Sequence, residues 1–194
     1  MGKIGASGKD GIAIANGTNM IFDHCSVSWG RDENFSISGG SGEDPGLVTI
    51  QNCLIAQGLV PHSCGGLIQD FNGVSILRTL YIDNDTRNPK VKGINEYINN
   101  VIYNWNSAAY ILGDSAADSY ANVIGNYFIS GPNTGAAPFT RGNLNFHIYA
   151  LNNYHDSNKN GLLDGSLLSQ GAYGTVDWQT VAYDYPGVKT LHPV

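Results

Sequence analysis

A short cationic segment is the first group of residues in this sequence with an evident chemical use. Arg87, Lys90 and Lys92 lie close together, although the chain of 194 residues has only 10 lysines and arginines. If the segment is extended along one face of the protein, its cationic side chains can bind an anionic ligand. Pro89 would stiffen the backbone that presents them. The alternative is an ordinary solvated turn.

A second segment has the composition of a calcium-binding loop. It places oxygen-bearing side chains at its first, third, fifth and ninth positions: Asp156, Asn158, Asn160 and Asp164. Calcium prefers oxygen ligands, and this order matches the first half of an EF-hand loop. Leu167 replaces the glutamate of the twelfth position, so the match is incomplete. The composition is also that of a plain turn, and both interpretations stay open.

A repeated unit can supply the scaffold that positions these residues. A strand-like run recurs along the chain, centred on His24, Asn52, Thr79, Asn100, Asn126 and Asn153. The spacings of 28, 27, 21, 26 and 27 residues are those of a solenoid. Short runs of Val, Ile, Tyr and Phe separated by Gly, Asn, Asp and Pro are typical of strands and turns, so helical repeats are disfavoured.

We therefore predict an all-β fold, a right-handed parallel β-helix with about six coils and two or three strands in each coil. An amide at the same place in each coil can form a hydrogen-bonded ladder inside a bend. The candidates for this ladder are Asn52, Asn100, Asn126 and Asn153. We expect His24 to be a core or ladder residue. Residues 1–161 would form the coils, and 162–194 would cover the last coil or a flank of the same domain.

The predicted solenoid is short. Parallel strands about 4.8 Å apart give a stack of about 29 Å for this number of coils. Solenoids are capped at both ends, yet the repeat begins almost at Met1 and nothing amphipathic precedes it. The sequence therefore predicts a chain that is truncated at its N-terminal end.

The charge and hydropathy of the chain limit its partners. The net charge is -6 and lysine and arginine form no run, which disfavours nucleic acid and anionic membranes as partners. No apolar stretch approaches the roughly 20 residues that cross a bilayer, and the first residues lack the apolar region of a signal peptide.

The cysteines and glycosylation triplets add little. The three cysteines have no C-x-x-C spacing, and we expect buried thiols rather than disulfides or zinc ligands. The N-x-S/T triplets at Asn16, Asn34 and Asn84 are frequent by chance in an Asn-rich chain. They give a weak indication of secretion.

Four sequence motifs occur in a fixed order. They are D-H-C-S-x-S-W-G-x-D-E at 23–33, V-T-I-Q-N-C-L-I at 48–55, R-N-P-K-V-K at 87–92 and N-N-V-I-Y-N-W at 99–105. Together they resemble the pectate lyase superfamily, polysaccharide lyase family 1, over about residues 8–154. That family has the right-handed parallel β-helix fold. The resemblance implies a secreted enzyme that cleaves polygalacturonate, or de-esterified pectin, by β-elimination and leaves an unsaturated product.

The resemblance assigns roles to the cationic segment. Arg87 stands at the position of the family's base, which removes the C5 proton, and Lys92 stands where a cation binds the substrate carboxylate; Lys90 is expected to assist it. Because a guanidinium normally stays protonated, this role requires calcium and lysine charges to lower the pKa of Arg87. Cys64 replaces a substrate-binding lysine of the family, which leaves His62 as the nearby candidate for binding substrate.

Calcium is the implied cofactor, because Ca²⁺ can bridge an anionic polymer and a protein of negative charge. Asp10 matches one calcium ligand of the family, and Ala6 occupies the position of a second. Asp32 and Glu33 are further candidates for binding calcium or sugar, with a solvated turn as the alternative. Trp29, beside them, is a possible platform for a sugar ring.

Other functions remain open. A non-catalytic β-helix that binds pectin or another glycan is favoured by Cys64 in place of lysine and Ala6 in place of a carboxylate. An inactive lyase fragment would behave in the same way. A pectin hydrolase needs paired carboxylates as acid and base, and the sequence has no Asp-Asp pair. We expect a monomeric, calcium-dependent lyase.

Overall fold

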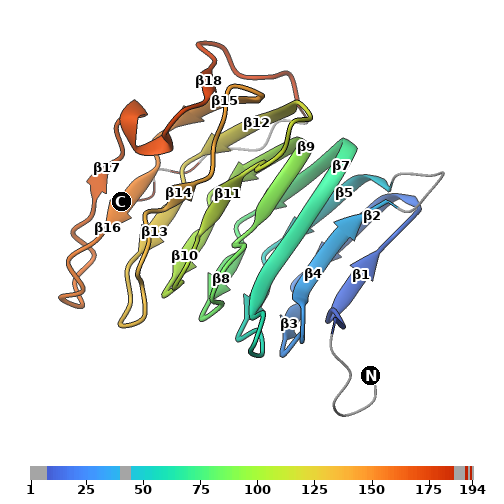
Figure 1. Ribbon diagram of the computed structural model, residues 1–194, viewed down its shortest axis with the longest axis horizontal. Helices are drawn as coiled ribbons and strands as arrows, with labels where there is room; N and C mark the ends of the chain where they lie inside the picture. Colours follow the sequence, from blue (N-terminus) through green and yellow to red (C-terminus); the bar gives the residue numbers. More distant parts are fainter. Residues whose placement is uncertain (1–7, 40–44, 186–190, 192, 194) are drawn as a thin grey trace.

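The chain is a parallel β-helix. The computed structural model describes residues 8–39, 45–185, 191 and 193, and Ala6 lies outside these ranges. Successive coils pair in parallel along two long sheets, and the described residues contain little helix, so the predicted all-β solenoid is confirmed (Figure 1).

Each coil has three faces. The first face contains β1 (Ile12–Ile14), β4 (Glu33–Ser38), the first parts of β7 (Cys64–Leu77) and β9 (Lys90–Ile98), β11 (Tyr110–Leu112) and β14 (Phe139–Thr140). The second contains β2 (Thr18–Asp23), β5 (Gly46–Gln51), the later parts of β7 and β9, β12 (Ser119–Ile124), β15 (Phe146–Leu151) and β18 (Asp177–Trp178). The third contains β3 (Ser26–Ser28), β6 (Leu54–Ala56), β8 (Leu80–Ile82), β10 (Val101–Tyr103), β13 (Tyr127–Ile129) and β16 (Tyr154–Asp156).

The core is built from side chains that stack from coil to coil. On the first face, Ile14, Ile37, Ile68, Val91 and Leu112 are register partners in successive coils, and all are buried. Each such side chain contributes roughly 1.5 to 3 kcal/mol through burial. Because side chains alternate along a strand, the residues between them point outward, where a ligand can reach them.

The asparagine ladder lies at the corner between the second and third faces. Each corner begins with a residue of positive φ: His24, Asn52, Arg78, Asn99, Gly125 and Asn152. The next residue belongs to the ladder, and its N–H donates to the side chain of the following coil: Cys25 to Cys53, Cys53 to Thr79, Thr79 to Asn100, Asn100 to Asn126 and Asn126 to Asn153. The ladder is therefore confirmed for Asn100, Asn126 and Asn153.

The prediction is wrong for Asn52 and His24, which lie one position before the ladder. Asn52 donates to the Asp23 carboxylate at 3.0 Å. The His24 side chain is 75% exposed and its Nδ1 lies 2.7 Å from Asp23. The polar residue types of His24 and Asn52 resemble the ladder position, whereas the corner geometry makes Cys25 and Cys53 the equivalent residues.

A second asparagine network lies inside the corner after the third face. Asn34 donates to the Asn84 amide oxygen at 2.8 Å, and Asn84 donates to that of Asn88 at 3.0 Å. All three side chains are buried, so two of the three N-x-S/T triplets have an interior asparagine. Asn16, in the third triplet, is exposed.

The last described segment packs against the end and flank of the coils. β17 (Ser166–Leu167) pairs antiparallel with β16, and η1 (Gln170–Tyr173) places Tyr173 against the core. Further on, the backbone of Tyr183 exchanges two hydrogen bonds with the Asn122 side chain on the second face. Cys53 and Cys64 are buried free thiols, as expected, whereas the free thiol of Cys25 is only partly buried. Within the described ranges, no helix has the length and hydropathy of a membrane span.

Candidate active site

The loops that enter β4, β7 and β9 lie beside one another along one edge of the first face (Figure 1). Glu33 is the register partner of Cys64, and Cys64 forms a bridge with Thr86 in the next coil. The Gly66 N–H donates to the Arg87 carbonyl at 2.6 Å. Three segments that are distant in the sequence therefore meet at Glu33, Cys64 and Arg87.

Arg87 and Glu33 form an ion pair at the centre of this group, in which Arg87 Nη1 donates to Glu33 Oε1. The Glu33 side chain is 5% exposed and that of Arg87 is 31% exposed. Burial raises the pKa of Glu33, and the hydrogen bond from Arg87 offsets part of this rise. This pairing is not evident from the sequence, because it joins residues 54 positions apart.

The surroundings of Arg87 favour its charged form. Burial lowers the pKa of the guanidinium, but the Cys64 sulfur and the bonded Glu33 carboxylate raise it by more, so it lies above its ordinary value. The expectation that calcium and lysine charges lower this pKa stays a prediction for the calcium-bound protein. Among the described residues, Glu33 supplies a negative charge beside Arg87, and Lys90 is paired with Asp114.

Two further carboxylates flank Glu33. Asp10 accepts the Glu33 N–H at 3.1 Å and also accepts the Ser36 hydroxyl. Asp32 lies 2.6 Å from His62 Nδ1, and the His62 side chain is 56% exposed. The structure thus brings the sequence-predicted residues Asp10, Asp32, Glu33, His62 and Arg87 into one neighbourhood.

The donor set suits a cation that prefers oxygen. Ligand atoms of Asp32, Glu33 and Cys64 all lie within 4.8 Å of one another. Burial raises the pKa of the Cys64 thiol to about 12, so it stays protonated and is a poor ligand. The carboxylates of Asp32 and Glu33, with Asp10 beside them, are ligands of the kind that calcium uses.

The two lysines of the cationic segment point outward from β9. Val91, between them, is fully buried, so Lys90 and Lys92 lie on the outer side of the first face. Lys90 Nζ donates to Asp114 at 3.1 Å, and the Lys90 side chain is 15% exposed. Lys92 is the register partner of Gln69 in the preceding coil.

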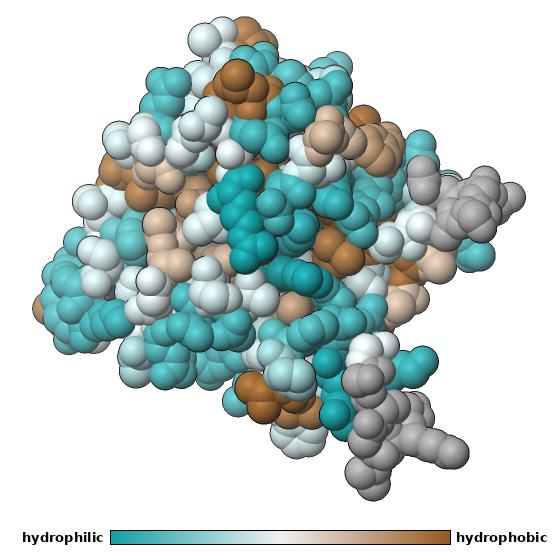
Figure 2. All heavy atoms as spheres, viewed as in Figure 1, coloured by the Kyte–Doolittle hydropathy of each residue, from teal (hydrophilic) through white to brown (hydrophobic). Residues whose placement is uncertain are grey.

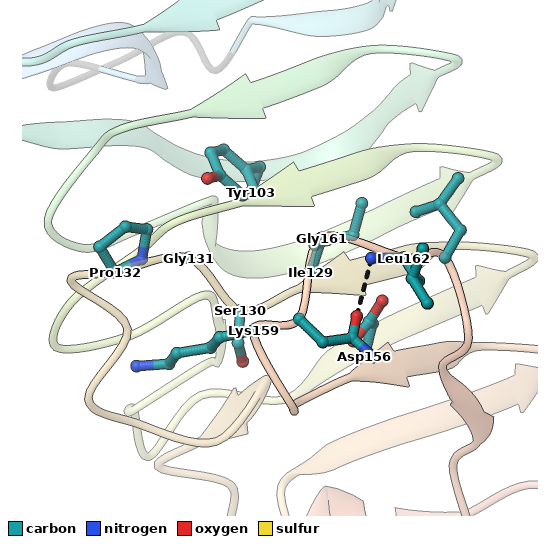
Figure 3. Close-up of a pocket in the computed structure, with 11 residues that line it drawn as sticks. Tyr103, Ile129, Ser130, Gly131, Pro132, Asp156, Lys159, Gly161 and Leu162 are labelled. Atoms are coloured by element: carbon teal, nitrogen blue, oxygen red, sulfur yellow. Dashed lines mark hydrogen bonds between the residues drawn. The ribbon is translucent and has the colours of Figure 1, made fainter.

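The loop at 156–164 lies away from Arg87, on the outer side of the third face. The amides of Asn158 and Asn160 donate to the two oxygens of Asp164, at 2.7 and 2.9 Å. Asp156 is 3% exposed, and its Oδ2 has no hydrogen-bond partner. Asp156 and Asn160 line a cavity of about 520 Å³ together with Tyr103 and Ile129 (Figure 3).

Comparison with known proteins finds close relatives of this chain. No family model matches the chain. "Probable pectate lyase C" of Aspergillus fumigatus is 61% identical over 100% of this chain and 46% of that protein. "Probable pectate lyase C" of Aspergillus flavus is 61% identical over 98% of this chain and 45% of that protein. "Pectate lyase 3" of Ambrosia artemisiifolia is 33% identical over 64% of this chain and 30% of that protein.

The chain thus spans about half the length of the fungal relatives that it matches. Identity of this extent, together with the parallel pairing of the coils and the order of the sequence motifs, shows the relationship. This chain is thus related over nearly all of its length to proteins named as pectate lyases.

Proposed function

We propose that this protein is a pectate lyase that cleaves polygalacturonate by β-elimination. The observation that carries the proposal is the group of Arg87, Glu33 and Asp32 at one edge of the first face, in a chain 61% identical to a probable pectate lyase. A base, carboxylates and outward lysines lie along the same face.

The proposed reaction breaks one C–H and one C–O bond. A base removes the C5 proton, a double bond forms between C4 and C5, and the bond from C4 to the glycosidic oxygen breaks. That oxygen takes a proton from water as it leaves. The C5 proton lies next to a carboxylate and becomes acidic once that charge is neutralised. The product is an unsaturated uronide.

Arg87 is the proposed base, and Lys90, Lys92 and His62 are the proposed groups that bind substrate carboxylates. Arg87 has to separate from Glu33 and lose a proton to solvent before it can accept the C5 proton, because that ion pair favours its charged form. Lys90 similarly exchanges Asp114 for a substrate carboxylate. His62 is held at the edge of the site by Asp32.

Asp10, Asp32 and Glu33 are the proposed calcium ligands. When bound there, calcium would neutralise the substrate carboxylate and so favour loss of the C5 proton. Without a cation, the three carboxylates would repel a polyanion. The net charge of the chain, -6, would add to this repulsion.

The loop formed by Asp156, Asn158, Asn160 and Asp164 is a second proposed calcium site. The observation that favours it is the unpaired oxygen of Asp156, because a buried carboxylate oxygen without a partner is costly unless it meets a cation or donor. Both amides can turn their oxygens toward the ion. This site is structural, because it lies on another face from Arg87.

We also propose that the protein is a monomer and that it acts outside the cell. The location follows because its substrate is a polymer too large to enter a cell. The described residues 8–39 and 45–161 form the coils of the proposed domain, and the segment from residue 162 covers its last coil and flank.

Mass spectrometry of digested polygalacturonate tests this function. A lyase yields an unsaturated product one water lighter than the product of a hydrolase. A protein that only binds the polymer depletes it from solution and yields neither product. The proposal predicts the lighter product, and either of the other results contradicts it.

A further inference from the structure

Trp29 is a large aromatic side chain on the outside of the molecule. It is 66% exposed and lies in the loop that enters β4. Its indole N–H donates to the Gln57 side-chain oxygen at 3.3 Å, which orients the ring without covering it. Its backbone φ is 65°, a left-handed value that is uncommon for a bulky residue. A similar value recurs at this corner in the following coils, at Gln57, Asp83 and Asn104, so the corner of the solenoid sets the direction of the Trp29 side chain.

Two exposed apolar side chains belong to the loop of the next coil. Leu59 is 42% exposed and Val60 is 80% exposed. The Leu59 N–H donates to the Gly30 carbonyl at 2.8 Å, so this loop is joined to the residue after Trp29. Figure 2 shows an apolar patch at the lower edge of the molecule, where the loop between β6 and β7 lies in Figure 1. Adjacent exposed apolar groups of this kind mark binding surfaces.

This apolar surface is continuous with the candidate active site. The segment that follows Trp29 leads within a few residues to Asp32, which holds His62, and to Glu33, which holds Arg87. A polymer bound at Arg87 extends beyond the reacting sugar in both directions. One direction passes the Trp29 loop, because that loop and the loop that carries His62 lie in neighbouring coils.

We propose that Trp29, with Leu59 and Val60 beside it, is a subsite for one pyranose ring of the galacturonan chain. The inference rests on the proposed function and names where the substrate extends beyond the reacting sugar. The C–H face of a pyranose is apolar and stacks on an indole, while the ring's hydroxyl and carboxylate groups stay in water. Gln57 keeps the indole in place for this contact.

The first test is kinetic. Trp29→Ala is expected to raise KM for polygalacturonate by roughly tenfold and to leave kcat within about twofold, because the ring contributes binding remote from the reacting bond. Trp29→Phe keeps an aromatic face and should recover most of the affinity. Leu167→Ala removes a similarly exposed apolar side chain on β17 and is the control, with unchanged KM. An unchanged KM in Trp29→Ala overturns the proposal.

The second test needs no catalysis and so separates the two proposals. Trp105 is buried and Trp178 is partly buried, so Trp29 is the main target of an aqueous fluorescence quencher. Hexagalacturonate with calcium should protect the fluorescence from acrylamide, and digalacturonate should protect it much less. If the hexamer protects a chain that does not cleave it, the subsite stands and the lyase proposal fails. If an active lyase shows no protection, the subsite is overturned.

Discussion

Arg87 and Glu33 depend on each other, because a nearly buried carboxylate keeps its charge only beside a cation. Removing Arg87 alone leaves Glu33 unpaired at 5% exposure, which is strongly destabilising in general. Loss of activity in such a variant would therefore not separate chemistry from folding. The sequence motifs identify Arg87, Asp32 and Glu33 as candidate site residues. That Glu33 is the partner of Arg87 is determined by which coils stack on each other.

The double substitution Glu33→Gln with Arg87→Gln tests the pair without leaving a buried charge. It should abolish lyase activity and keep the melting temperature within about 5 °C of the unmodified protein. Circular dichroism and the uronide assay measure the two effects. Arg87→Ala alone should melt lower than the double variant. If the double variant retains full activity, Arg87 is not the base.

Glu96 provides a pH-dependent test on the second face. It is 3% exposed, and burial raises its pKa, an effect partly offset by the Ser75 hydroxyl that donates to it at 2.5 Å. A raised folded-state pKa adds stability at low pH, and that stability is lost as pH rises through the folded value. Glu96→Gln should therefore raise the melting temperature by a few degrees at pH 7. The gain should vanish below about pH 4, and an equal gain at both pH values would contradict this explanation.

At the scale of elements, the corners hold the solenoid together. Asn126 donates to the Tyr97 carbonyl at 2.8 Å and to Asn153, and accepts the N–H of Asn100. The sequence predicted this ladder correctly at Asn100, Asn126 and Asn153 and misplaced it by one position at Asn52. In the first two coils the ladder position is occupied by Cys25 and Cys53. The sequence did not indicate them, because a cysteine carries no amide.

Asn126→Ala tests the ladder. It leaves buried donors and acceptors without partners in the two neighbouring coils and should cost roughly 2 to 4 kcal/mol, or about 10 °C in melting temperature. Asn145→Ala is the matched control, because its amide makes one hydrogen bond, to the exposed Ala116 carbonyl at 3.0 Å. Thermal melts of both variants measure the difference. Equal losses would show that the ladder adds nothing beyond a surface hydrogen bond.

The loop at 156–164 provides a test of metal binding that does not involve activity. A ligand that binds the folded state raises its stability by mass action. Millimolar calcium should raise the melting temperature by several degrees, and Asp156→Asn with Asp164→Asn should remove most of that rise. A similar calcium effect in this variant would assign the stabilisation to the acidic group near Arg87 instead.

At the scale of the whole molecule, periodic strands and turn residues were sufficient to predict the solenoid. The buried stack from Ile14 to Leu112 follows directly from alternating apolar residues. The site was less accessible to prediction. The network of Asn34, Asn84 and Asn88 and the ion pair of Arg87 with Glu33 depend on which coils are neighbours and on their register, and sequence spacing alone specifies neither.

If this face of the solenoid cleaves galacturonan by β-elimination with calcium, the products absorb ultraviolet light. The decisive measurement is the ultraviolet absorbance of polygalacturonate incubated with the protein, in calcium and in EDTA, compared with the double variant at Glu33 and Arg87. Absorbance should rise in calcium but not in EDTA, and the double variant should produce none. Absorbance that is unaffected by EDTA or by the double substitution, or none from a folded protein in calcium, would contradict this mechanism.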